Sequence, residues 1–144
     1  MTIDKSGKRS RGTDSHDLDA YLIEFTAAAY AADRIVRARC TCGADSFSLE
    51  VDDEQGCARR TCAACRMQHF MLDSGEYSAD ASLEECACPC GKEVFQLAIA
   101  FSHRPDGSIK WVTVGARCTA CGVLGAYTDW KIDYEPADHL YEAV

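Results

Sequence analysis

The 144-residue chain has no long uninterrupted apolar run. Residues 1–17 are polar throughout, whereas a secretory signal needs a basic start followed by an apolar stretch of roughly 7–15 residues. The most apolar early segment, residues 21–36, is interrupted by Glu24, Asp33 and Arg34. Neither a signal peptide nor a membrane-spanning helix is expected there. We therefore expect a cytoplasmic protein.

Positive charge is also scarce. The formal net charge is -8, and residues 40–87 contain three Arg or Lys against ten Asp or Glu. Affinity for nucleic acid depends on Lys and Arg that neutralise phosphates, so this balance favours a protein partner, and a basic one. The single basic cluster lies within residues 1–15, a segment whose Gly and Ser content predicts a disordered tail. Its members are Lys5, Lys8, Arg9 and Arg11.

Motifs of common catalytic sites are missing as well. The sequence contains no Ser-His-Asp set, no phosphate-binding glycine loop and no His-Glu-His metal motif. We therefore expect no enzymatic activity and assign no catalytic residue.

Cysteine, by contrast, is abundant, with ten residues in the chain. So many cysteines indicate either a disulfide framework or metal ligation. Thiols stay reduced in the cytosol, where paired cysteines are more often metal ligands than disulfides. Metal binding is therefore the better interpretation.

An internal repeat organises these cysteines. The sequence CTCGADSFSLEV at residues 40–51 aligns without a gap with CPCGKEVFQLAI at residues 88–99, and CAAC at 62–65 stands opposite CTAC at 118–121. In both copies the apolar residues after the first cysteine pair alternate with polar or small ones, as in a half-buried strand. The offset between the copies grows from 48 to 56 residues. We assign this eight-residue difference to the loop that joins the first two strands, because insertions at hairpin tips cost little.

Each copy supplies four cysteines as two close pairs, the arrangement that structural zinc prefers. Glycine follows the first pair in both copies, where it permits a positive φ and lets amides approach the sulfurs. Zinc is favoured over iron because it is the commoner structural ion. Two such sites would take the net charge from -8 to -12, since each adds four thiolates and one divalent ion. The predicted ligand sets are Cys40, Cys42, Cys62 and Cys65, and Cys88, Cys90, Cys118 and Cys121.

This pattern resembles the zinc-ribbon superfamily, in which a cysteine knuckle, a hairpin, a second knuckle and a further strand surround a four-cysteine zinc site. The resemblance implies two tandem antiparallel β units, at residues 38–73 and 88–134. Residues 74–87 would then be a linker and residues 135–144 a C-terminal tail. The Cys-x-Cys half departs from the usual two-residue spacing of ribbon signatures.

One helix is expected before the repeat. Apolar residues recur at helical spacing over residues 16–37, and Asp14 or Ser15 suits the cap position. The fold class is therefore mostly β with one N-terminal α-helix. We expect the apolar face of this helix to pack on one or both ribbons, and the alternative is that it binds a partner.

Residues outside the ligand sets leave some options open. Cys57 and Cys86 have no counterparts in the repeat, and Cys86 stands close enough to Cys88 to offer an alternative ligand. His69 is expected to be a partly buried strand residue, while His16 and His139 are expected in solvent. The aromatic residues after position 109 have acidic neighbours, so we assign them to the core or to a protein interface rather than to base stacking.

Three functional hypotheses follow. The first is a non-catalytic, zinc-binding protein-interaction module, with an inhibitor or immunity-type protein for a basic partner as its narrower form. The second is a nucleic-acid-binding zinc-ribbon regulator. The third is a redox protein that acts either through iron in a rubredoxin-like four-cysteine site or through the thiols of Cys57 and Cys86. The sequence does not indicate the partner or the oligomeric state.

Overall fold

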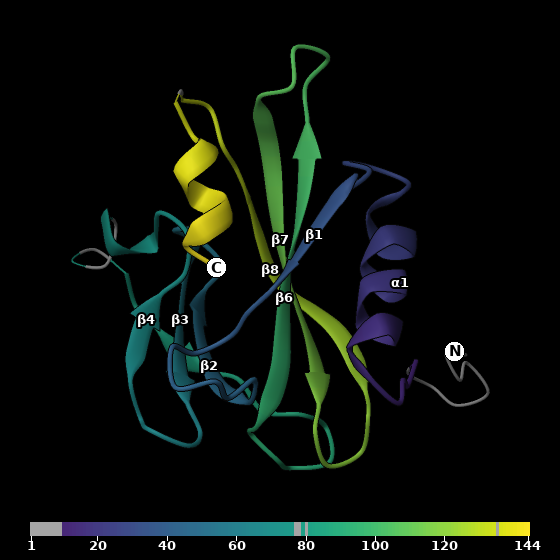
Figure 1. Cartoon of the computed structure of the whole chain (residues 1–144), viewed down its shortest axis with the longest axis vertical. Coiled ribbons are helices and arrows are strands. Elements are labelled where there is room, and N and C mark those ends of the chain that lie inside the picture. Colours follow the sequence, from purple (N-terminus) through teal and green to yellow (C-terminus); the bar gives the residue numbers. More distant parts are fainter. Residues whose placement is uncertain (1–9, 77–78, 80, 135) are drawn as a thin grey trace.

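A computed structural model describes residues 10–76, 79, 81–134 and 136–144 of the chain (Figure 1). Its strands form one antiparallel sheet, with a single α-helix beside the longest strands. This confirms the predicted fold class. The elements in chain order are α1 (Ser15–Thr26), β1 (Arg34–Arg37), β2 (Phe47–Asp52), β3 (Cys57–Cys62), β4 (Gln68–Phe70), η1 (Ser74–Glu76), β5 (Glu84–Glu85), β6 (Phe95–His103), β7 (Ile109–Cys118), β8 (Leu124–Lys131) and η2 (Asp138–Glu142), where η denotes a 3-10 helix.

The two repeats share this sheet. The strand order is β4-β3-β2-β6-β7-β8, so the first copy (β2, β3, β4) and the second copy (β6, β7, β8) meet where β2 pairs with β6. Phe47 stands opposite Phe95 at that junction. Because β2 and β6 meet at one residue pair, the rest of their facing edges pairs with two short strands, β5 on β2 and β1 on β6. We refer to the two halves of the sheet as the first and second lobes.

The length difference between the copies lies mainly in the strands. In the first lobe β2 and β3 have six residues each, with residues 53–56 between them. In the second lobe β6 has nine and β7 has ten, with residues 104–108 between them. The prediction that the extra eight residues lie in the loop was therefore wrong. Seven of them lengthen the strands of the β6–β7 hairpin, whose ladder runs from the Phe95–Cys118 pair to the His103–Ile109 pair.

The sheet of the second lobe is buried on both faces. One face joins the main core, to which Phe95, Leu97 and Ile99 contribute together with Phe47 and Leu49 of the first lobe. The other face is covered by α1, whose Leu18 and Leu22 form a second cluster with small residues of β6 and with Leu124 of β8. The helix is therefore part of the second lobe's core, which agrees with the prediction that its apolar face packs on one of the two repeat units.

The helix itself is shorter than predicted. Asp14 caps it by accepting hydrogen bonds from the backbone amides of His16 and Asp17, as the sequence suggested. However, α1 ends at Thr26 rather than near residue 37, and residues 34–37 form β1. The hydroxyl of Thr26 donates to the Leu22 carbonyl and accepts from the amide of Ala32, which stabilises the chain's exit from the helix.

Both terminal segments contribute to the fold where they are described. The Leu124 amide donates to the Ser10 carbonyl, and the Gly12 amide donates to the Gly122 carbonyl, so residues 10–12 lie along the second lobe. Residues 1–9 of the predicted disordered tail lie outside the described residues. At the other end, residues 135–144 were predicted as a tail, yet η2 buries Leu140 completely.

The segment predicted as a linker, residues 74–87, contains η1 and β5. Among the described residues, none of the helices has the length and apolar character needed to cross a membrane.

Candidate metal centres

The structure brings together all eight cysteines of the predicted sets, in two clusters. Cys40, Cys42, Cys62 and Cys65 form the first cluster, and within it all ligand atoms lie within 4.8 Å of one another. The sulfur of Cys40 lies 3.5 Å from that of Cys65, and the sulfur of Cys42 lies 3.6 Å from that of Cys62. These residues come from the start and the end of the β2–β3 hairpin.

The second cluster repeats this geometry at the corresponding end of β6 and β7. It consists of Cys88, Cys90, Cys118 and Cys121. The sulfurs of Cys88 and Cys121 are 3.4 Å apart, and those of Cys90 and Cys118 are 3.7 Å apart. A tetrahedron with zinc–sulfur bonds of about 2.3 Å has sulfur–sulfur edges of about 3.8 Å. Both clusters therefore have the dimensions of a four-cysteine metal site, and each could hold one ion.

Tight backbone turns place the sulfurs. Gly43 and Gly91 follow the first pairs with φ values of 94° and 91°, a conformation that costs glycine little. The same turn is closed in both copies, because the Gly43 amide donates to the Cys40 carbonyl and the Gly91 amide donates to the Cys88 carbonyl. The glycines predicted to shape the knuckles therefore do so.

Backbone amides also favour the thiolate form of one cysteine in each second pair. The amides of Cys65 and then Ala64 lower the pKa of Cys62 to about 6. Burial raises the pKa of Cys118, but the amides of Cys121 and Ala120 outweigh it and bring the pKa to about 7. Thiolate is the form that binds metal, so the turns that position these sulfurs also prepare them as ligands.

Burial divides each cluster into an inner and an outer half. Cys40 and Cys62 of the first cluster, and Cys88 and Cys118 of the second, are buried, whereas their partners in each pair are exposed or half-buried. For Cys88, burial is the main cause of a pKa raised to about 12. Without a metal ion, burial therefore keeps the Cys88 thiol protonated, and a divalent ion would have to displace that proton to bind there.

A buried arginine near the first cluster was not predicted. Arg60 on β3 is 6% exposed, its guanidinium lies 4.6 Å from the ring centre of Phe47, and it donates to the Val144 carbonyl at 3.0 Å. Burial lowers its pKa, while the charges of Cys40 and Cys62 act in the opposite direction. The available signal was its position two residues from both Ala58 and Cys62, which places it on the inward face of β3.

Tyr127 is the corresponding neighbour of the second cluster. Its ring lies edge-on to Phe95 with centroids 5.3 Å apart. Its pKa is raised, first by burial and then by the nearby cysteines. The first cluster therefore has a cation beside it, while the second has a neutral phenol.

The two spare cysteines lie outside both clusters. The thiol of Cys57 is fully buried and donates to the Ser74 carbonyl. Burial raises the pKa of half-buried Cys86 to about 11. His69 is a partly buried residue of β4 whose ring contacts the Ala143 carbonyl at 2.9 Å, while His16 and His139 are exposed. These placements agree with the predictions for the histidines.

A groove of about 460 Å³ lies beside the first lobe and is strongly acidic. Two of its aspartates hold loops in place, because Asp52 accepts the amides of Gln55 and Ser82, and Asp53 accepts the hydroxyl of Thr128. Its remaining carboxylates, from Glu54, Glu84 and Glu85, are exposed. The neighbouring carboxylate of Glu93 raises the pKa of Glu85, because two acidic groups lie close together there. We call this feature the acidic groove.

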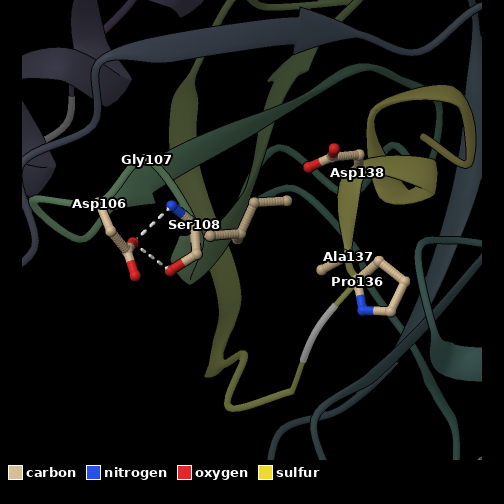
Figure 2. Close-up of a pocket in the computed structure, with 7 residues that line it drawn as sticks. Asp106, Gly107, Ser108, Pro136, Ala137 and Asp138 are labelled. Carbon is tan, nitrogen blue, oxygen red and sulfur yellow. Dashed lines mark hydrogen bonds between the residues drawn. The ribbon is translucent and has the colours of Figure 1, made fainter.

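A smaller pocket of about 320 Å³ lies between the β6–β7 turn and the segment before η2 (Figure 2). The carboxylate of Asp106 lies beside Ser108, whose amide and hydroxyl donate to one of its oxygens at 2.9 and 2.7 Å (Figure 2). These bonds also lower the pKa of Asp106. This carboxylate is therefore used inside its own turn, and the other carboxylate that lines the pocket belongs to the exposed Asp138.

The candidate centres are thus defined by geometry alone. No protein-family model, curated protein or solved structure matches the chain. Among the described residues, the two four-cysteine clusters are the groups of ligating side chains that could hold metal ions.

Proposed function

We propose that each cluster holds one structural zinc ion and that the chain is a non-catalytic protein-interaction module with a basic protein as its partner. The observation that carries the zinc assignment is the pair of four-sulfur clusters, each with all sulfurs within 4.8 Å and two sulfur–sulfur distances between 3.4 and 3.7 Å. Four cysteines complete a tetrahedron and leave no position for the water that a catalytic zinc needs. Both sites therefore support a stabilising role.

Metal analysis is the first test. Protein purified without added metal should contain two zinc ions per chain, and a chelator should release both and expose eight further thiols to titration. Iron in place of zinc would support the redox hypothesis. A content of one ion or none, or disulfides between these cysteines, would contradict the assignment for at least one lobe.

The acidic groove supports the choice of a basic partner. Five carboxylates line it, from Asp52, Asp53, Glu54, Glu84 and Glu85. Zinc-bound thiolates would make the molecule still more negative, so a partner rich in Lys and Arg gains from long-range attraction as well as from contacts in the groove. An inhibitor or immunity-type protein for a basic target is the narrower form of this proposal.

Binding of an arginine-rich peptide at about 0.15 M ionic strength tests the groove. The double variant Glu84→Gln, Glu85→Gln should weaken binding. The matched control, Asp138→Asn with Glu142→Gln, removes the same charge from the exposed residues of η2 and should have a smaller effect. Equal losses of affinity would mean that the peptide responds to net charge alone and not to the groove. No binding at this ionic strength would contradict a basic partner.

A further inference from the structure

A pocket of about 440 Å³ combines positive charge with aromatic rings in this otherwise acidic molecule. It is lined by Tyr30, Arg104, Lys110, Trp111 and Lys131, and we call it the cation–aromatic pocket. The sequence had suggested that aromatic residues after position 109 lie among acids. The fold instead brings Trp111 together with three cations from the ends of β6, β7 and β8.

The two aromatic rings of the pocket form a stack. The rings of Tyr30 and Trp111 stack with centroids 4.1 Å apart and planes 9° from parallel. Tyr30 is held from behind because its carbonyl accepts a hydrogen bond from the hydroxyl of Ser102. The amino group of Lys110 lies 5.3 Å from the ring centre of Tyr30, close enough for a cation–π contact. The stack therefore positions one cation and leaves its ammonium at the pocket.

Arg104 is fixed by the backbone. Its guanidinium donates to the Ile109 carbonyl at 2.6 Å and to the Ile132 carbonyl at 2.7 Å, with a further bond to Ser108. An arginine has five N–H groups, so two remain for another acceptor. The groups that accept these bonds are neutral. The acid that senses the charge of Arg104 is Asp106, whose pKa is lowered first by the Ser108 bonds and further by that charge, without an ion pair between the two side chains.

Lys131 completes the set, since it stands opposite Trp111 in the β7–β8 ladder. Within the described part of the chain, no ion pair joins Arg104, Lys110 or Lys131 to a carboxylate. The indole N–H of Trp111 is also buried without an acceptor. A buried donor without a partner is uncommon in folded proteins, so this region has an excess of donors.

We propose that the cation–aromatic pocket binds the phosphate group of a small molecule. Phosphate offers several strong acceptor oxygens and a double negative charge, which suits one arginine and two lysines. The volume exceeds that of a bare ion and falls within the range of about 300–1,000 Å³ found for small-molecule sites. This inference uses residues outside the clusters and the acidic groove and is independent of the proposed function.

Nuclear magnetic resonance of the metal-loaded, ¹⁵N-labelled protein tests the pocket with inorganic phosphate and with a nucleoside monophosphate. The indole N–H signal of Trp111 should shift and saturate. The signal of Trp130, whose N–H donates to Asp73 at 3.1 Å, should remain and serves as the internal reference. Chloride at equal ionic strength should leave both signals in place.

Charge-removing variants locate the site. Lys110→Gln and Lys131→Gln should each weaken phosphate binding by about tenfold, the effect expected for one charge-assisted hydrogen bond. The matched control is Lys92→Gln, which removes an exposed lysine beside the second cluster. Equal weakening by all three variants, or an unshifted Trp111 signal at about 10 mM phosphate, would overturn the proposal.

A third measurement compares the ligands that could carry the phosphate group. Equal affinity for phosphate and the monophosphate means that the phosphate group alone is recognised, and tighter binding of the monophosphate means that its remaining atoms fill the pocket. Either result supports the proposal. A short single-stranded oligonucleotide that binds far more tightly than both, with a steep salt dependence, would replace it with nucleic-acid binding.

Discussion

The two lobes differ most at one cross-strand pair that occupies the same place in both copies of the repeat. In the first lobe Glu50 stands opposite Arg59, and their side chains form an ion pair at 2.7 Å. In the second lobe the aligned residues are Ala98 and Gly115. Small side chains at that position leave room for a helix, whereas the ion pair fills the equivalent space.

Helix α1 occupies the space above Ala98 and Gly115 and packs closely against the strand. A Cβ atom added to Gly115 would lie 2.5 Å from a methyl carbon of Leu22. The backbone of β7 therefore approaches α1 closely enough to exclude any larger residue. This comparison shows that the two repeated hairpins keep the same cysteine pairs at one end while one face of the sheet is solvated in the first lobe and covered by a helix in the second.

The largest expected effect comes from replacing one buried ligand in each lobe. Cys62→Ser and Cys118→Ser should each remove one of the two metal ions, a loss that can exceed a lobe's stability because apparent zinc-binding free energies reach about 10–16 kcal/mol. With Cys62→Ser, α1 and the Trp111 signal should persist. With Cys118→Ser they should vanish, because α1 packs on the second lobe. Metal analysis and amide spectra measure both. Complete unfolding of both variants would show that neither lobe stays folded when the other loses its metal ion.

Next in size is the helix contact itself. Leu22→Ala should lower the free energy of unfolding by about 2–5 kcal/mol, since Leu22 is fully buried and its truncation leaves a cavity. Urea denaturation of the metal-loaded protein gives the value. The neighbouring Ile23→Ala is the control, and with a side chain 51% exposed it should cost within about 0.5 kcal/mol. Similar values for the two variants would mean that α1 is not docked as described.

Gly115→Ala tests the close approach and should cost about 1–3 kcal/mol through overpacking against Leu22. The aligned change in the first lobe, Arg59→Ala, should cost about 1 kcal/mol or less, because it removes a partly exposed ion pair. In a Leu22→Ala background the cost of Gly115→Ala should fall, since the clashing methyl groups are gone. Additive costs in this double-mutant cycle would place the strain elsewhere.

The smallest expected effect is that of Arg66→Gly, at a turn that the lobes build with different residues. Arg66 follows the second cysteine pair of the first lobe with a φ of 67°, and Gly122 takes the aligned place in the second with a φ of 80°. Arg66→Gly should stabilise the protein by up to about 1 kcal/mol by relieving the left-handed conformation. Gly122→Ala should destabilise it, because the new Cβ would lie 2.5 Å from the Gly12 carbonyl oxygen. Thermal unfolding compares the signs, and the same sign for both would contradict the structure.

Local patterns predicted the metal clusters well. Cys-x-Cys-Gly and Cys-x-x-Cys each place two sulfurs through a single turn. The ligand pairs can therefore be identified from the sequence without any knowledge of distant contacts. Their repetition in register then indicated which pairs combine, and Cys86 stayed outside the clusters as the repeat implied. The period-two apolar pattern likewise located β2 and β6.

The sequence-based predictions failed where a segment forms hydrogen bonds with backbone groups that are distant in the sequence. Residues 34–37 continued a helical apolar pattern, but their amides and carbonyls pair with the open edge of β6. Ile35 and Val36 are also β-branched, which favours a strand once an edge is available. Arg60 was missed for a related reason, because its burial depends on Phe47 and on the carbonyl of Val144, far away in the sequence.

By itself, the sequence determined the two four-cysteine sets, the duplicated strands and the helix start at Asp14, because each depends on residues close together in the chain. Only the tertiary structure decided that the copies share one sheet, that α1 covers the second lobe and that three cations gather beside Trp111. Those outcomes depend on which edges and faces remain free once the hairpins have formed. Side-chain size at Ala98 and Gly115 then selects the face on which the helix can pack.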